Sequence, residues 1–122
     1  MSKETGRVLS TREACVYVKF SEDKNVECLI DTGFNGFLSL PKKLVETFNL
    51  EIIGSQTIIA VGNKKIVCEL ASVEITWLGM TQNVEVIVND GDDFLIGTEL
   101  LQSCILRINY KNNKLTIRSV KS

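Results

Sequence analysis

The 122-residue chain contains no histidine. Nucleophilic systems of the Ser-His-Asp or Cys-His type need an imidazole base, so the chain cannot build one on its own. The commonest protein ligand of zinc is missing for the same reason. Carboxylates, thiols, lysines and tyrosines remain as the side chains that could carry acid–base or nucleophilic chemistry.

The chain also lacks a long apolar run and an excess of charge of one sign. No apolar run reaches the length of about 18 residues that a membrane-spanning helix needs. Residues 1–7 are polar and lack the apolar centre of a secretory signal, so we expect a cytoplasmic protein. The net charge of −1 gives no electrostatic reason to expect nucleic acid or a membrane surface as a partner.

The four cysteines form no Cys-x-x-Cys pair and lie in apolar, strand-like segments; they are Cys15, Cys28, Cys68 and Cys104. We expect reduced, buried thiols that behave as small hydrophobic side chains, with disulfides or a metal site as the alternatives. The acidic run 89–93 lacks the spacing and the terminal glutamate of a calcium loop, so we expect a solvated loop there. No cofactor is expected.

Length and composition indicate one globular domain that can bury a sizeable core, since 44% of residues are apolar and 24% are charged. Residues 1–13 are polar, and we expect a loose arm or a short terminal strand before a domain at 14–122. Alternating and β-rich patterns predict a mostly β fold with one or two short helices. The strands are predicted at 14–20, 26–30, 37–40, 55–60, 65–75, 83–88, 105–110 and 114–118, and a helix at 42–48, with Pro41 at a first helical position.

One stretch, residues 28–38 (CLIDTGFNGFL), places a carboxylate between two apolar segments. Burying an unpaired carboxylate is costly, so Asp31 must be paired, protonated or facing a cleft. An ordinary turn acid is the plain alternative, because Asp, Thr and Gly are common turn residues.

Leu29-Ile30-Asp31-Thr32-Gly33 resembles the signature of aspartic proteases, in the single-motif branch that includes the retroviral proteases. Residues 94–101 (FLIGTELL) resemble the second signature of that family, in which two apolar residues and a glycine lead into a short helix, which the resemblance implies at 98–103. The predicted hairpin at 58–67 lies where the family has its flap. The three features occur in the family's order along nearly the whole chain. The resemblance implies a small closed-barrel acid protease fold, similar to the bacterial members of the retropepsin-like family.

The same resemblance implies an aspartic endopeptidase that acts as a homodimer on a peptide or protein substrate. Asp31 would meet Asp31 of a second subunit, because the chain has one Asp-Thr-Gly motif. Thr32 would hold the two loops together, and Gly33 would let the backbone approach the substrate. The remaining residues that the resemblance assigns are Phe34, Ala60, Val61, Gly62 and Asn63 for substrate binding, and Leu95, Ile96 and Gly97 for structural support.

Phe34 departs from the retroviral pattern, which has a small residue at this position, and a phenyl ring here would narrow the cleft. This leaves a second function open: a non-catalytic module that binds peptides or dimerises on the same scaffold. A thiol-based redox protein that uses Cys28 is a third alternative, and it would need a lowered thiol pKa. Trp77 beside a predicted turn could belong to the core, to a dimer surface or to a partner site.

Overall fold

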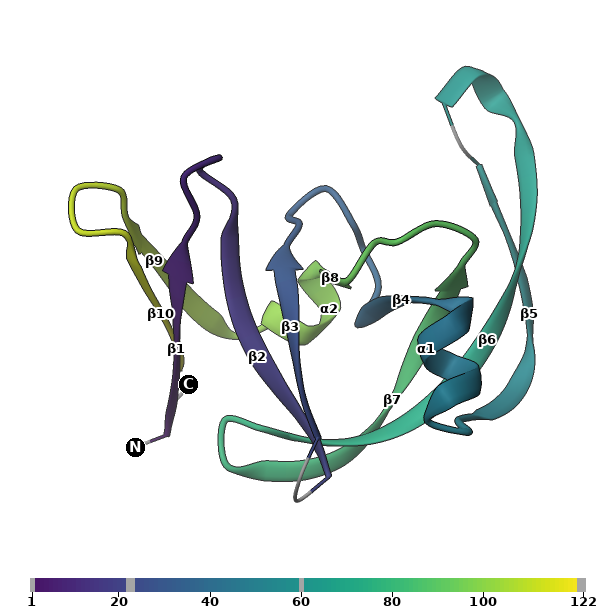
Figure 1. Cartoon of the computed structure of the whole chain (residues 1–122), viewed down its shortest axis with the longest axis horizontal. Coiled ribbons are helices and arrows are strands. Elements are labelled where there is room, and N and C mark those ends of the chain that lie inside the picture. The colour runs from purple at the N-terminus through teal and green to yellow at the C-terminus, as the bar shows by residue number, and fades with distance from the viewer. Residues whose placement is uncertain (1, 22–23, 60, 121–122) are drawn as a thin grey trace.

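The computed structural model describes residues 2–21, 24–59 and 61–120, which form ten strands, two short α-helices and one 3₁₀ turn (Figure 1). The strands are β1 (Lys3–Val8), β2 (Ala14–Ser21), β3 (Lys24–Ile30), β4 (Leu38–Pro41), β5 (Glu51–Ile59), β6 (Lys65–Trp77), β7 (Met80–Asn89), β8 (Leu95–Ile96), β9 (Cys104–Asn109) and β10 (Lys114–Ser119). The helices are α1 (Lys42–Thr47) and α2 (Thr98–Leu101), and the 3₁₀ turn is η1 (Val61–Asn63).

Six strands close into a ring in the order β2–β3–β8–β4–β7–β6, and the pair Lys19–Thr76 joins β6 back to β2. β5 extends this ring from β6, and β1, β10 and β9 extend it in that order from β2. Most neighbours are antiparallel, but β3 pairs with β8 and β4 pairs with β7 in parallel. The predicted fold, a small and mostly β closed barrel with short helices, is confirmed.

Alternation along the strands fills the ring with apolar side chains, as the period of two requires. Val16 and Val18 of β2 are 1% and 0% exposed, and Val84, Val86 and Val88 of β7 are also buried. Each fully buried side chain of this size contributes roughly 1.5–3 kcal/mol. The core therefore rests on the alternating valine rows that the sequence pattern predicts.

Two of the four cysteines and Trp77 are buried in this core. Cys15 and Cys28 are buried, whereas Cys68 and Cys104 are half-buried, and all four thiols are free. Trp77 is 3% exposed and belongs to the core. None of the helices in the described part of the chain is long and apolar enough to cross a membrane.

Helix α1 begins one residue later than predicted. Pro41 is the last residue of β4, with the extended ψ of 145°, and pairs with Asn89 of β7. The fixed φ of proline suits both a strand end and the residue before a helix, so the sequence alone does not separate the two. The helix ends at Thr47, one residue before the predicted end, and Asn49 follows in the left-handed region at a φ of 51°, as is common after a helix.

The first strand is integrated into the sheet. β1 pairs with β2 on one side and with β10 on the other. Of the two alternatives for residues 1–13, the structure has the short terminal strand. The turn predicted between β2 and β3 includes residues 22–23, which lie outside the described residues.

Candidate active site

Parallel pairing of β3 with β8 brings the two signature segments together. Leu29 pairs with Leu95 and Ile30 with Ile96, so the two segments leave the sheet at the same edge. The Leu29 amide donates to the Phe94 carbonyl oxygen at 2.7 Å, and the Asp31 amide donates to the Ile96 carbonyl oxygen at 2.9 Å. Asp31 therefore begins its loop while still tied to the end of β8.

The loop itself orients the Asp31 carboxylate. The Gly33 amide donates to Asp31 Oδ1 at 2.9 Å, and the Phe34 amide donates to the Asp31 carbonyl oxygen at 3.1 Å. A Cβ at position 33 would lie 3.3 Å from the same carboxylate oxygen, so glycine allows this close approach. Asp31 is half-buried, and Thr32 is exposed beside it.

Three backbone hydrogen bonds then fasten this loop to the start of α2. The Gly97 amide donates to the Phe37 carbonyl oxygen at 3.0 Å, and the Thr98 amide donates to the Phe34 carbonyl oxygen at 2.8 Å. The Glu99 amide donates to the Gly36 carbonyl oxygen at 3.2 Å. The amides at a helix start have no partner within the helix, so the loop carbonyls satisfy them. The loop and α2 form one connected unit.

The Phe34 ring packs between two glycines of this unit. A Cβ at Gly36 would lie 2.6 Å from Phe34 Cζ, and a Cβ at Gly97 would lie 2.7 Å from Phe34 Cδ2. No side chain larger than hydrogen fits at either position without moving the ring. The ring is half-buried and lines a cleft, and its place between the glycines explains how the chain accommodates a residue that is small in the retroviral pattern.

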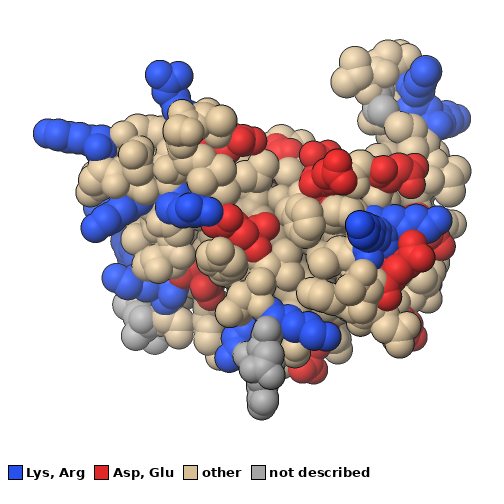
Figure 2. All heavy atoms as spheres, viewed as in Figure 1, with Lys and Arg blue, Asp and Glu red and all other residues tan. Residues whose placement is uncertain are grey.

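A cleft of about 810 Å³ lies between the Asp31 loop and the β5–β6 hairpin. Its lining consists of Asp31, Gly33, Phe34, Asn35, Gly36, Phe37, Ser39, Gln56, Thr57, Ile58, Ile59, Cys68, Glu85, Ile87, Asn89, Leu95 and Glu99. Three of these residues are acidic and none is a lysine or arginine. Figure 2 shows acidic side chains gathered beneath the projecting hairpin. The cleft therefore combines apolar walls with negative charge.

The β5–β6 hairpin projects beyond the ring of strands (Figure 1). At its tip Val61 is 98% exposed, and Gly62 and Asn63 have φ values of 80° and 59°, as the predicted turn requires. The strand residues below the tip line the cleft, but Val61, Gly62 and Asn63 do not. Ala60, which was predicted to bind substrate, lies outside the described residues.

The remaining predicted positions fall around the same unit. Leu95 lines the cleft, Ile96 is fully buried, and Gly97 is buried under Phe34. The support role that the resemblance implies for these three residues stays a prediction. Among the described residues, no carboxylate is hydrogen-bonded to that of Asp31. The last pair of the parallel ladder is Ile30 with Ile96, and the residue that follows Ile96 is Gly97, which carries no side chain.

Sequence reasoning missed the cleft wall formed by β4 and β7. The Asn89 Nδ2 group donates to Ser39 Oγ at 3.0 Å and to the Asp93 carbonyl oxygen at 2.9 Å, which anchors the acidic loop to this wall. Glu85 and Ile87 precede Asn89 on the same face of β7. The alternation of β7 was visible in the sequence, but its parallel pairing with β4 was not.

The thiol beside the motif has the wrong properties for redox or nucleophilic chemistry. Burial raises the pKa of the Cys28 thiol from its usual 9.0 to about 12, with smaller contributions from Cys15 and Glu27. Reactive thiols need a lowered pKa and access to solvent, whereas Cys28 is 0% exposed. The redox alternative for Cys28 is therefore not supported.

Solved structures of similar fold agree with this geometry. No protein-family model matches the chain, and no curated protein matches it in sequence. A retropepsin-like aspartic protease from Rickettsia conorii matches in structure with a TM-score of 0.67 and 18% identity, over 96% of this chain and 90% of that one. The EIAV protease, crystallised with an inhibitor, matches with a TM-score of 0.62 and 19% identity, over 76% and 88%.

A third similar structure is the retroviral protease-like domain of Ddi1 from Leishmania major. It matches with a TM-score of 0.50 and 18% identity, over 88% of this chain and 93% of that one. At these identities the likeness concerns the fold. The chain has the fold of the retropepsin-like aspartic proteases, and the family resemblance predicted from its motifs is confirmed at that level.

Proposed function

We propose that this protein is an aspartic endopeptidase that hydrolyses peptide bonds as a homodimer. The observation that carries the proposal is the Asp31 carboxylate, held by the Gly33 amide at the end of β3 and lining a cleft beneath a projecting hairpin. Among the described residues no carboxylate is hydrogen-bonded to that of Asp31, and Gly97, which follows the last β3–β8 pair, carries no side chain. Asp31 of a second subunit supplies the other carboxylate in this proposal.

Two carboxylates about 3 Å apart cannot readily both ionise, so the pair holds one proton between them. The ionised member then takes a proton from a bound water, which attacks the substrate carbonyl carbon. The protonated member donates to the carbonyl oxygen, which gives a neutral tetrahedral diol. The carboxyl group that took the water proton then gives it to the amide nitrogen, and the other carboxylate takes a proton from one hydroxyl of the diol. The C–N bond breaks to release the amine and a carboxylic acid, and the pair again holds one proton. Because the two titrations are coupled, the pH profile of the reaction reports the pair and not either residue alone.

The substrate in this proposal is an extended peptide that lies between the Asp31 loop and the hairpin. Its main chain pairs with the hairpin strands, and its side chains enter pockets on alternate sides. Apolar contact surface in the cleft comes from Phe34, Phe37 and Ile87. In the proposed dimer, Thr32 joins the two Asp31 loops across the dimer axis. Glu85 and Glu99, with no cation in the lining, favour peptides that carry lysine or arginine near an apolar residue.

The test compares wild type with Asp31→Asn on a mixed peptide library between pH 3 and 8, at several protein concentrations. Asparagine keeps the shape of the side chain but cannot transfer the proton. The matched control is Asp90→Asn, which makes the same change on the exposed acidic loop outside the cleft lining. We expect cleavage by wild type and the control, loss of at least about 10³-fold in Asp31→Asn, and inhibition by statine peptides.

Three results would contradict the proposal: equal activity of the Asp31→Asn variant, full specific activity at concentrations at which the protein is monomeric, or a folded and dimeric wild type that cleaves nothing. In the last case, binding of uncleaved library peptides would identify a peptide-binding module. Phe34 at the cleft wall would then be the first residue to replace with alanine.

A further inference from the structure

Three strands that the proposed protease mechanism does not use carry a concentration of positive charge. β1, β10 and β9 lie side by side at the opposite end of the sheet from the β5–β6 hairpin (Figure 1). They contain one carboxylate, Glu4, and five cationic residues. The exposed cations, which we call the basic face, are Lys3, Arg7, Arg107, Lys114 and Arg118. Figure 2 shows basic side chains gathered at this end of the molecule.

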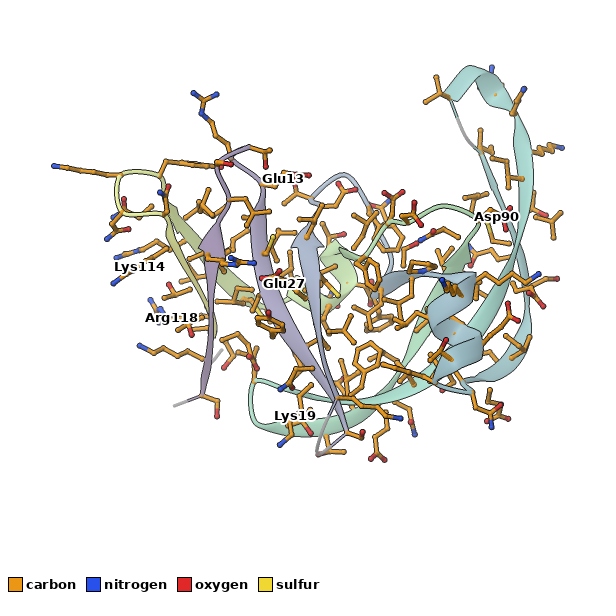
Figure 3. The ribbon with its side chains drawn as sticks, viewed as in Figure 1. Glu13, Lys19, Glu27, Asp90, Lys114 and Arg118 are labelled. Carbon is orange, nitrogen blue, oxygen red and sulfur yellow. The ribbon has the colours of Figure 1, made fainter. Side chains whose placement is uncertain are left out.

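The register of the strands places these cations on one surface. Lys3 pairs with Arg118 and Arg7 pairs with Lys114 across β1 and β10, and Thr116 of β10 pairs with Arg107 of β9. Paired residues project from the same face of a sheet, and so do alternate residues of one strand. All five cations therefore project from the same side, where Figure 3 labels Lys114 and Arg118 on β10.

This charge is poorly balanced within the chain. Arg7 is held by Glu27 through two hydrogen bonds of 2.9 Å. Glu4 projects from the other face, where its Oε2 accepts a hydrogen bond from the Leu78 amide at 2.8 Å. Among the described residues, no other ion pair is formed by the basic face. Like charges that face each other across a ladder are destabilising, so this arrangement favours an anionic partner.

The strand at the end of this surface also has an open edge. Within the described residues β9 pairs with β10 alone, so its outer backbone groups have no strand partner. The opposite face of β9 carries Cys104, Leu106 and Ile108, which pack against the core and are half-buried. A strand added at this edge would place one set of alternate residues beside the cations and the other set over this apolar row.

These features discriminate between the possible occupants. Two copies of β9 paired with each other would bring two basic faces together, which disfavours a second copy of this chain. A nucleic acid could bind the cations through its phosphates, but it would leave the backbone edge and the apolar row uncovered. An extended protein segment can use all three features at once.

We propose that β9 is a docking edge for an extended segment of another protein in which acidic and apolar residues alternate. The main chain of the segment pairs with β9, its carboxylates lie beside Arg107 and Arg118, and its apolar side chains cover Leu106 and Ile108. This surface is at the far end of the sheet from the hairpin, so the proposal does not depend on the activity of Asp31.

The test uses a fluorescent peptide of four Val-Glu repeats and the Asp31→Asn protein, so that cleavage cannot interfere. Fluorescence anisotropy at low and moderate salt measures binding to this protein, to a form with Arg107→Glu and Arg118→Glu added, and to a control form with Lys42→Glu and Lys43→Glu added. The control makes the same change of charge on exposed residues of α1. We expect at least about tenfold weaker binding to the β9 variant and unchanged binding to the control.

Peptide controls separate strand addition from general attraction of anions. A peptide of the same composition in two blocks, and an alternating peptide with N-methylated backbone amides, should both bind at least about tenfold more weakly. Amide hydrogen exchange of residues 104–109 should slow when the alternating peptide binds. If the Glu variant does not fold by circular dichroism, the variant with Arg107→Gln and Arg118→Gln replaces it.

The proposal is overturned if the alternating peptide does not bind at low salt, which would leave the cations as protection of an exposed edge. It is also overturned if the block peptide or a single-stranded oligonucleotide binds as well as the alternating peptide. Equal weakening by the α1 control would show that net charge, and not the basic face, attracts the peptide.

Discussion

Gly97 is the residue at which the site tolerates the least change. A Cβ there would meet the Gly36 carbonyl oxygen and would lie 2.7 Å from both the Phe34 ring and its carbonyl oxygen. Two of these three contacts are backbone atoms that already take part in the fastening of the loop to α2. Overpacking of this kind cannot be relieved by rotating a side chain.

We therefore expect Gly97→Ala to lower the free energy of unfolding by about 2–3 kcal/mol and to reduce any activity that depends on Asp31. Urea unfolding measures the first effect. Gly91→Ala is the control, because the nearest atom to a Cβ there is Asn89 Oδ1 at 3.8 Å, and its change should stay within about 0.5 kcal/mol. Equal losses of stability in the two variants would mean that the close contacts with Phe34 are not the reason for glycine at position 97.

Cys28 gives a pH dependence with a definite sign. Its thiol pKa is raised from 9.0 to about 12 in the folded state, chiefly by burial. Between these values the unfolded chain has lost the proton and the folded chain retains it, so the contribution of Cys28 to stability is constant below pH 9 and falls as the pH rises above it. One such group contributes a slope of about 1.4 kcal/mol per pH unit.

The expected result is that Cys28→Ala is less stable than wild type near neutral pH but loses stability more slowly between pH 9 and 11. Urea unfolding at a series of pH values, under reducing conditions, gives both slopes. Cys104→Ala should keep the steeper slope, because burial raises the pKa of that half-buried thiol without producing so large a shift. Parallel slopes for wild type and Cys28→Ala would contradict the assignment.

At the scale of elements, we expect the tip of the β5–β6 hairpin to contribute to substrate binding but little to the stability of the fold. Val61 at its tip is 98% exposed and gives almost no burial to the folded chain. Val61→Ser should change the free energy of unfolding by less than about 0.5 kcal/mol. If the tip closes over a bound peptide, the same substitution should raise KM by about fivefold with kcat nearly unchanged, since an apolar contact of roughly 1 kcal/mol is lost.

Steady-state kinetics on a cleaved peptide checks this expectation. Met80→Ser is the matched control: Met80 is 69% exposed and lies at the turn between β6 and β7, outside the cleft lining. An increase in KM for both variants, or for neither, would contradict closure of the tip on the substrate.

Elements also show what the sequence could predict. The alternation in β2 and β7 is local, and so is the β5–β6 hairpin; each was predicted from its own residues. The parallel pairs β3–β8 and β4–β7 join segments more than 40 residues apart. Local propensity carries no signal for such pairings, so the cleft wall at Ser39, Glu85 and Asn89 could not be predicted.

At the scale of the whole molecule, the proposed dimer must be compatible with the way in which the terminal strands pair within one chain. β10 pairs with β1 on one side and with β9 on the other within the same chain. A partner strand could join β10 only by displacing one of them, so the proposed dimer must use other contacts to bring the two Asp31 loops together.

Subunit mixing tests whether those loops form one site. When wild type and Asp31→Asn are mixed in equal amounts and allowed to exchange, about one quarter of random dimers contain two Asp31 carboxylates. If the water is activated between both carboxylates, mixed dimers are inactive. The activity should then fall to about one quarter of that of wild type at the same total concentration.

If each subunit acted with its own carboxylate alone, the mixture would instead retain about one half of the wild-type activity, because the active subunits are diluted but not impaired. The Asp90→Asn protein, mixed in the same way, should leave the activity unchanged. A remaining activity of one quarter therefore indicates a shared dyad, and a remaining activity of one half indicates two independent sites. It does so without assuming where on the surface the two subunits meet.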